Sequence, residues 1–169
     1  MRRISTWVAL SILLTTFGAF AQGSAAPPVT VFLVRHAEKE ATGPDPSLTE
    51  AGRKRADAWG AMLADAGITA IFSSEYKRTQ ETAAAVGKRL GVTVTTVPAK
   101  ELDALVSKIR ELAPGSRALV VGHSNTVPAA AAKLTGAKVD EMAETDFDRL
   151  YVASVRGGAG DVVVLRTSP

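Results

Sequence analysis

The chain contains two histidines, and each lies just beyond an apolar run. His36 follows residues 31–34, with Arg35 between, and His123 follows residues 118–121, with Gly122 between. A short run of apolar, partly β-branched residues is typical of a buried strand, and open α/β sheets bind ligands just outside the carboxyl ends of their strands. One histidine at a strand end is as often structural as functional, but two at such places predict a shared site.

Arg78 is a third polar group at a predicted turn, where a helix begins after the second strand. An arginine at a helix start is usually a solvated surface charge. In a parallel sheet, however, this turn faces the same edge as Arg35-His36 and His123-Ser124. Two guanidinium groups and two imidazoles around one point form a site for a tetrahedral oxyanion, because guanidinium forks match phosphate oxygens.

His36 is the predicted nucleophile of this site. A histidine can form a covalent phosphoryl intermediate, which splits one difficult step into two easier ones. The ring must be neutral for that reaction, and Arg35 and Arg78 disfavour its cationic form. The same arginines would stabilise the charge of the transferring phosphoryl group.

Strands and helices alternate along the predicted domain. We expect an α/β fold, a three-layer sandwich in which a mainly parallel sheet has helices on both faces, with a C-terminal hairpin. The expected strands are 29–34, 68–72, 92–97 and 118–121, the expected helices are 51–66 (with Thr49 as N-cap), 78–90, 102–112 and 127–134, and the hairpin strands are 150–155 and 162–165.

The first residues have the pattern of a secretory signal peptide. Arg2 and Arg3 precede a charge-free, mostly apolar stretch over 7–20, and Ala19-Phe20-Ala21 forms a small-x-small cleavage site. An apolar stretch of about 14 residues is short for a membrane-spanning helix. We expect a signal peptide at 1–21, a flexible leader at 22–28 and one domain at 29–169. The mature protein would be periplasmic, without a stable membrane anchor.

Composition excludes several classes of function. The chain has no cysteine, which rules out thiol catalysis, thiolate metal sites and disulfides. Setting Arg2 and Arg3 aside reduces the formal net charge from +3 to about +1, so no nucleic-acid partner is expected. The basic run 53–55 lies on a predicted helix with an apolar opposite side and is interpreted as a solvated face.

Four ordered motifs resemble those of the histidine phosphatase superfamily, in its phosphoglycerate-mutase-like branch. The first has the family's Arg-His-Gly signature in an Arg-His-Ala form. The segments that carry the resemblance are 33–39, 47–52, 71–74 with 78–83, and 121–123, within a match that spans about 29–155.

The resemblance implies that His36 is the phosphorylated nucleophile and that Arg35, Arg78 and His123 bind phosphoryl oxygens. It implies no metal and no organic cofactor. The family also supplies a carboxylic acid after the third strand, for which Glu101 is the first candidate. Glu101 is equally an ordinary carboxylate at a helix start, favoured by the helix dipole, and Asp103 and Glu38 are alternatives.

The predicted function is an exported, metal-independent phosphatase that acts on a phosphorylated small molecule or envelope component. The 148 residues that follow the signal peptide leave no room for an inserted lid domain, so we expect an open pocket, which favours hydrolysis over phosphoryl return. Three alternatives stay open: a protein phosphohistidine phosphatase, a non-catalytic phosphate-binding module, and metal binding by His36 and His123, which the nearby arginines disfavour. The sequence specifies neither the oligomeric state nor the physiological substrate.

Overall fold

The computed structural model describes residues 26–167. The predicted signal peptide and most of the leader therefore lie outside the described residues. The helices are α1 (Glu50–Met62), α2 (Lys77–Leu90), α3 (Leu102–Arg110) and α4 (Thr126–Thr135), and the strands are β1 (Val29–Arg35), β2 (Ala70–Ser73), β3 (Val94–Thr96), β4 (Arg117–Gly122), β5 (Arg149–Arg156) and β6 (Ala159–Arg166). None of the described helices is long and apolar enough to cross a membrane.

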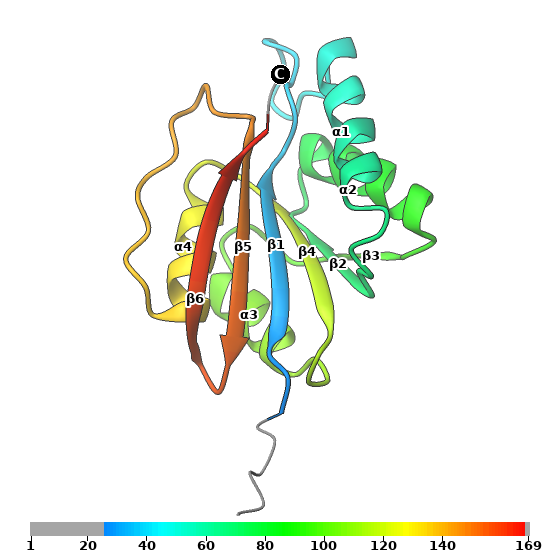
Figure 1. Cartoon of the computed structure of the whole chain (residues 1–169). Coiled ribbons are helices and arrows are strands. Elements are labelled where there is room, and N and C mark those ends of the chain that lie inside the picture. Colours follow the sequence, from blue (N-terminus) through cyan, green and yellow to red (C-terminus); the bar gives the residue numbers. More distant parts are fainter. Residues whose placement is uncertain (1–25, 168–169) are drawn as a thin grey trace, which may run out of the picture.

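The six strands form one mixed sheet in the order β3-β2-β4-β1-β5-β6 (Figure 1). The first four strands in this order are parallel to one another, and β5 and β6 add an antiparallel hairpin beside β1. The predicted α/β fold with a mainly parallel sheet and a C-terminal hairpin is therefore confirmed.

Helices cover both faces of the sheet, because strand residues alternate between two cores. On one face, Leu33 of β1 packs in a cluster with residues of α3 and α4 such as Ile109 and Leu134. On the other face, Val34 packs with Trp59 of α1 and Val86 of α2. This arrangement is the predicted three-layer sandwich.

The two largest differences from the predicted element boundaries are at the end of the first helix and at the start of the last strand. The first helix ends at Met62 and not at residue 66; Leu63 lies in the turn that follows and is still buried, which explains the extended apolar pattern. The hairpin turn consists of Gly157 and Gly158 alone, both with positive φ, the conformation that a two-residue hairpin turn requires. Strand β6 therefore starts at Ala159, three residues earlier than expected.

The pairing of β1 with β4 brings the two histidines together. These central strands are parallel, with Arg35 opposite Gly122. The pairing continues one residue further, where the His36 N–H donates to the Gly122 carbonyl at 2.9 Å. Both strands end at the same edge of the sheet, so the side chains that follow them converge there.

Candidate active site

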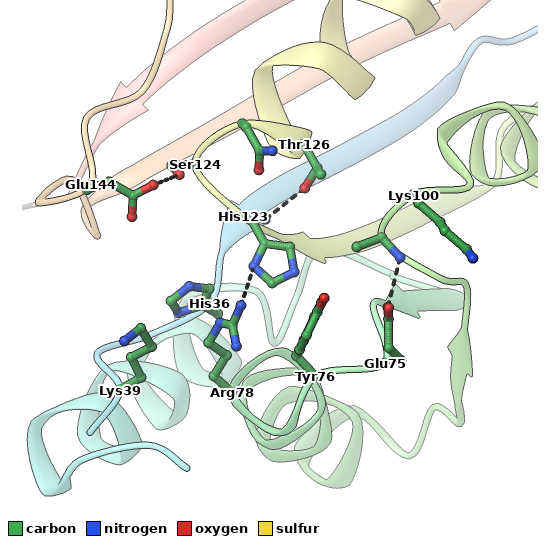
Figure 2. Close-up of a pocket in the computed structure, with 12 residues that line it drawn as sticks. His36, Lys39, Glu75, Tyr76, Arg78, Lys100, His123, Ser124, Thr126 and Glu144 are labelled. Atoms are coloured by element: carbon green, nitrogen blue, oxygen red, sulfur yellow. Dashed lines mark hydrogen bonds between the residues drawn. The ribbon is translucent and has the colours of Figure 1, made fainter. Parts of the chain in front are cut away.

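A cavity of about 570 Å³ opens at this edge of the sheet. At its histidine end lie His36, Arg78, His123 and Ser124, with the buried Arg35 directly behind His36. At its far end lie Glu75 and Lys100, on the opposite side of the view from His36 in Figure 2, and Tyr76 lies between, with its ring centroid 5.3 Å from that of His123. Ala99 and Asn125 also line the cavity. Lys39, Thr126 and Glu144 complete the lining.

His36 is held in the form of a neutral nucleophile. Its side chain is 2% exposed, and its Nδ1 lies 2.8 Å from the carbonyl oxygen of Ala37. A carbonyl oxygen can only accept, so Nδ1 carries the proton and Nε2 bears the lone pair. Burial lowers the pKa of His36 to about 4, an effect to which Arg35 and His123 add, so the ring is neutral at pH 7.

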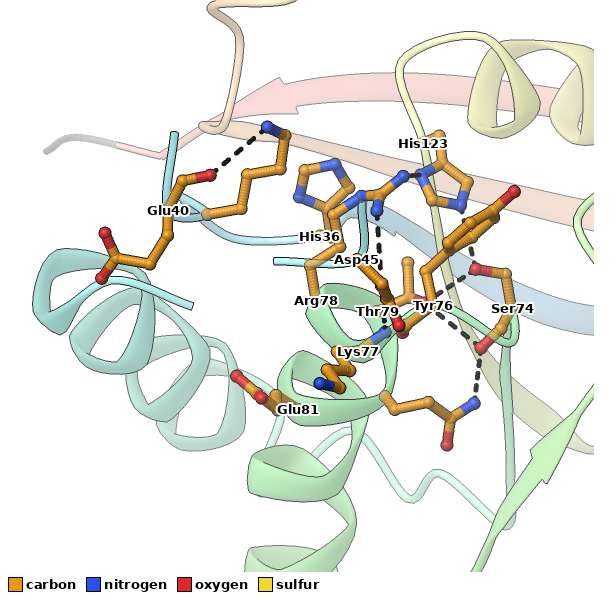
Figure 3. A network of polar contacts seen from close by, with 12 residues as sticks. His36, Glu40, Asp45, Ser74, Tyr76, Lys77, Arg78, Thr79, Glu81 and His123 are labelled. Atoms are coloured by element: carbon orange, nitrogen blue, oxygen red, sulfur yellow. Dashed lines mark hydrogen bonds and ion pairs between the residues drawn. The ribbon is translucent and has the colours of Figure 1, made fainter. Parts of the chain in front are cut away.

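His123 is fixed by a chain of hydroxyl groups (Figure 3). Arg78 Nη2 lies 3.4 Å from Nδ1 and can only donate, so Nδ1 is the acceptor and Nε2 carries the proton. Nε2 then donates to the Ser74 hydroxyl at 2.9 Å, which in turn lies 2.7 Å from the Thr79 hydroxyl. Burial, followed by the charge of Arg78, lowers the pKa of His123 to about 4.

The two imidazoles lie side by side. Their ring centroids are 5.4 Å apart in an edge-to-face arrangement. Figures 2 and 3 show the Arg78 guanidinium between the two rings. The structure therefore brings Arg35, His36, Arg78, His123 and Ser124 together, as the sequence predicted.

Each of the two site arginines has a hydrogen-bond donor without a partner. The Nε atoms of Arg35 and Arg78 are buried and have no hydrogen-bond partner in the structure. Arg78 stacks on the Tyr76 ring at 4.4 Å, while its Nη2 donates to His123 and its Nη1 forms an ion pair with Asp45 at 3.8 Å, so its Nε is the donor without a partner. A buried N–H without a partner is costly, and an oxyanion in the cavity is the group that these donors suit.

The segment 143–147, which the sequence analysis did not assign to the site, covers Arg35. Arg35 Nη1 donates to the Ala143 carbonyl at 3.3 Å and also to that of Glu144. Arg35 Nη2 forms a 2.6 Å ion pair with the Glu144 carboxylate, and the Phe147 ring lies 4.3 Å from the guanidinium carbon. The Ser124 hydroxyl donates to the same carboxylate.

The three acids considered from the sequence lie elsewhere. Glu101 is exposed at the start of α3, makes no side-chain capping bond and does not line the cavity. Asp103 pairs with Lys133 on α4. Glu38 points toward α1, where Arg55 holds it at 2.7 Å. Burial works against ionisation of Glu38, yet the hydrogen bond from Arg55 keeps its pKa below the usual value.

Two other carboxylates line the cavity, Glu75 and Glu144. Glu75 accepts the backbone N–H of Ala99 at 2.8 Å, which fixes it against the loop before α3. The sequence carried one signal for Glu75, since it lies three residues before Arg78 in the motif segment. Glu144 gave no signal, because no periodic pattern places its irregular segment beside Arg35.

A metal site of the usual kind is not present in the part of the chain that the structure describes, where no three His, Asp or Glu side chains are grouped suitably. The two histidines face arginine donors and not further ligands.

Comparisons with known proteins agree with this geometry. Residues 31–103, which contain His36 and Arg78, match the family model described as histidine phosphatase superfamily (branch 1). The fold is that of solved members. Over these residues the chain is similar to members of this superfamily.

Several solved phosphatases share the fold. The protein histidine phosphatase SixA complexed with tungstate superposes with a TM-score of 0.68 at 17% identity, over 81% of this chain and 96% of that one. A SixA structure from Nakamurella multipartitia gives a TM-score of 0.64 at 21% identity, over 86% and 99% of the two chains. A mycobacterial glucosyl-3-phosphoglycerate phosphatase gives 0.67 at 16% identity, over 83% and 99%. A comparison with curated proteins finds no significant match.

Proposed function

We propose that this protein is a member of the histidine phosphatase superfamily and hydrolyses phosphomonoesters through a phosphohistidine at His36. The observation that carries the proposal is the buried, neutral His36, with Nδ1–H bound to the Ala37 carbonyl and the Nε2 lone pair free, beside two arginines with unpaired donors. A nucleophile needs a free lone pair, and a phosphoryl group needs donors that are already in place.

In the first step, Nε2 of His36 attacks phosphorus and the bond between phosphorus and the ester oxygen breaks. The ring then carries a positive charge, which the Ala37 carbonyl stabilises through Nδ1–H. Arg35, Arg78 and Ser124 bind the phosphoryl oxygens, and the departing oxygen takes a proton from solvent in the open cavity. In the second step, water attacks phosphorus, the P–N bond breaks, and His36 returns to its neutral form as inorganic phosphate leaves.

His123 is proposed to respond to the charge of the substrate. Its Nδ1 accepts a hydrogen bond from Arg78 in the free protein. A phosphoryl dianion favours the protonated ring, so Nδ1 would gain a proton and become a further donor. The Ser74 hydroxyl keeps the ring in the orientation that this requires.

The test is phosphate release from p-nitrophenyl phosphate in the presence of a chelator, because metal independence is part of the proposal. Wild type should turn over and His36→Ala should not. Acid-quenched wild type should contain a phosphohistidine that maps to His36. Equal turnover in both proteins, or loss of activity in chelator that zinc or magnesium restores, would contradict the proposal.

One observation favours a second candidate, a protein phosphohistidine phosphatase. Glu101, the acid first expected, lies outside the cavity, and hydrogen bonding to Ser124 keeps the pKa of Glu144 below its usual value. An alkyl ester needs a proton donor for its leaving group, whereas a phosphohistidine needs much less help. SixA is a protein histidine phosphatase of similar fold. Much faster cleavage of a phosphorylated histidine domain than of simple esters would select this candidate.

Export is also proposed, on the pattern of residues 1–21 alone. We expect the full-length chain to be processed after Ala21 and the product to appear in the periplasmic fraction. Amino-terminal sequencing of the secreted protein would check this, and an unprocessed chain in the cytoplasmic fraction would contradict it. Its substrate would then be a phosphorylated small molecule or envelope component.

A further inference from the structure

The Glu144 carboxylate binds donors that the proposed function assigns to the phosphoryl group. Its Oε2 accepts from Arg35 Nη2 at 2.6 Å, and its Oε1 accepts from the Ser124 hydroxyl. A carboxylate and a phosphoryl group present similar pairs of anionic oxygens to a guanidinium fork. The two anions would therefore bind the same donors.

Arg35 does not depend on that carboxylate for its position. Its Nη1 is held by the carbonyls of Ala143 and Glu144, and the Phe147 ring packs on its face. The edge formed by Nε and Nη2 is different, because Nε has no partner and Nη2 has only the Glu144 side chain. This edge is a bidentate fork that becomes fully available once the carboxylate moves away.

The carboxylate can move at small cost. The Glu144 side chain is 79% exposed, whereas that of Arg35 is 4% exposed. An exposed glutamate regains water when it leaves an ion pair, which makes such pairs weak. A phosphoryl dianion, by contrast, can be held by Arg35, Arg78 and Ser124 together, and it repels the carboxylate.

We propose that Glu144 is an internal competitor, displaced from Arg35 and Ser124 by the substrate's phosphoryl group and returning when inorganic phosphate departs. This inference rests on the proposed function of the cavity. The competitor weakens the binding of inorganic phosphate and of the phosphoryl group of an ester by the same factor. An ester with a polar leaving group can recover this loss through contacts at the far end, such as Lys100, and the bare product cannot.

The Glu144 carboxylate stays ionised near neutral pH. The hydrogen bond from Ser124 and the charge of Arg35 keep the pKa of Glu144 below its usual value, against a smaller opposing effect of burial. The carboxylate is therefore ionised between about pH 5 and pH 8, so its own ionisation adds no pH dependence to phosphate binding in that range.

A purely supporting role predicts the opposite sign. If Glu144 served to orient Arg35, its removal would loosen the guanidinium and weaken phosphate binding. If Glu144 competes, its removal tightens phosphate binding. The direction of one binding constant therefore separates the two roles.

The experiment measures the dissociation constant of inorganic phosphate by calorimetry, and its inhibition constant in the p-nitrophenyl phosphate assay. Glu144→Gln and Glu144→Ala should each bind phosphate about fivefold more tightly than wild type, the factor expected for an exposed ion pair. Glu141→Gln removes the same charge three residues earlier in the chain, at an exposed position outside the cavity, and should bind as wild type does.

Unchanged or weaker phosphate binding in both Glu144 variants, or equal tightening in Glu141→Gln, would overturn the proposal. If wild type forms the phosphohistidine at His36 while Glu144→Gln fails to tighten binding, the competitor alone is refuted. If wild type neither binds phosphate nor forms a phosphohistidine, the proposed function fails, and the competitor with it.

Discussion

At the histidine end of the cavity, Arg35, His36 and His123 are buried, and each is held by at least one hydrogen bond. At the far end, Glu75 and Lys100 are exposed. The first arrangement is typical of preorganised catalytic groups and the second of adaptable contacts. The fold thus fixes the side chains that would contact a phosphoryl group more tightly than those that would contact a leaving group.

The largest difference between the two ends should appear on truncation. We expect His123→Ala to lower kcat/KM by about a hundredfold or more, because the donor that His123 would provide to the bound phosphoryl group is lost. Lys100→Ala should cost less than about threefold with p-nitrophenyl phosphate, because an exposed charge contributes little. Steady-state kinetics of both variants would decide. Equal losses of kcat/KM in the two variants would contradict the distinction between a preorganised and an adaptable end.

The fall of kcat/KM at low pH tests whether His36 is neutral in the free protein. The pKa of His36 is lowered to about 4, so the ring gains a proton, and loses its lone pair, only below that pH. We expect kcat/KM, corrected for ionisation of the substrate, to stay level down to about pH 5 and to fall about tenfold per unit below pH 4. A limb centred near 6.5 would show that burial does not set the proton affinity of His36. Circular dichroism at each pH excludes unfolding.

A smaller effect is expected from the hydroxyl that orients His123. Ser74→Ala removes the acceptor of the Nε2 proton and should lower kcat by up to about tenfold, the effect of one hydrogen bond. Ser74→Thr should restore much of the loss. The matched control is Ser73→Ala, a neighbouring buried serine whose hydroxyl bonds only to the Ser74 carbonyl. Similar kcat values for the two alanine variants would contradict an orienting role.

The smallest effect should come from the acid first expected at this site. Because Glu101 is exposed and does not line the cavity, Glu101→Gln should change kcat by less than about twofold with both an aryl and an alkyl phosphate. The alkyl ester is the stricter substrate, since its leaving group depends more on a proton donor. A selective loss with the alkyl ester would restore Glu101 as the acid.

The histidine end could be predicted from the sequence because strand geometry places it. Apolar runs before His36 and His123 indicate parallel strands, and the carboxyl ends of parallel strands share one edge. The same reasoning placed Arg78 at the start of α2. The three-layer architecture followed from alternating periodicities, and the mismatches were confined to element ends, as at Met62.

Glu144 could not be predicted in the same way. Its segment has no regular structure, and its contact with Arg35 joins residues 109 positions apart. Such a contact depends on where an irregular chain crosses the sheet edge, which no local pattern encodes. The position of Glu101 depends on a similar irregular loop, of which Ala99 and Lys100 line the cavity and Glu101 does not.

Ala37, directly after His36, belongs to a small hydrophobic cluster that is separate from the two main cores. None of the described residues other than glycine has a positive φ, so this position does not require glycine. The methyl group of Ala37 is fully buried with Leu48 and Ala56, and its N–H donates to the Thr82 hydroxyl at 3.0 Å. Alanine also restricts the unfolded chain more than glycine does. The Arg-His-Ala form therefore anchors the loop at His36 by packing. Substitution at Ala37 would lower the thermal stability of the protein more than its catalytic rate.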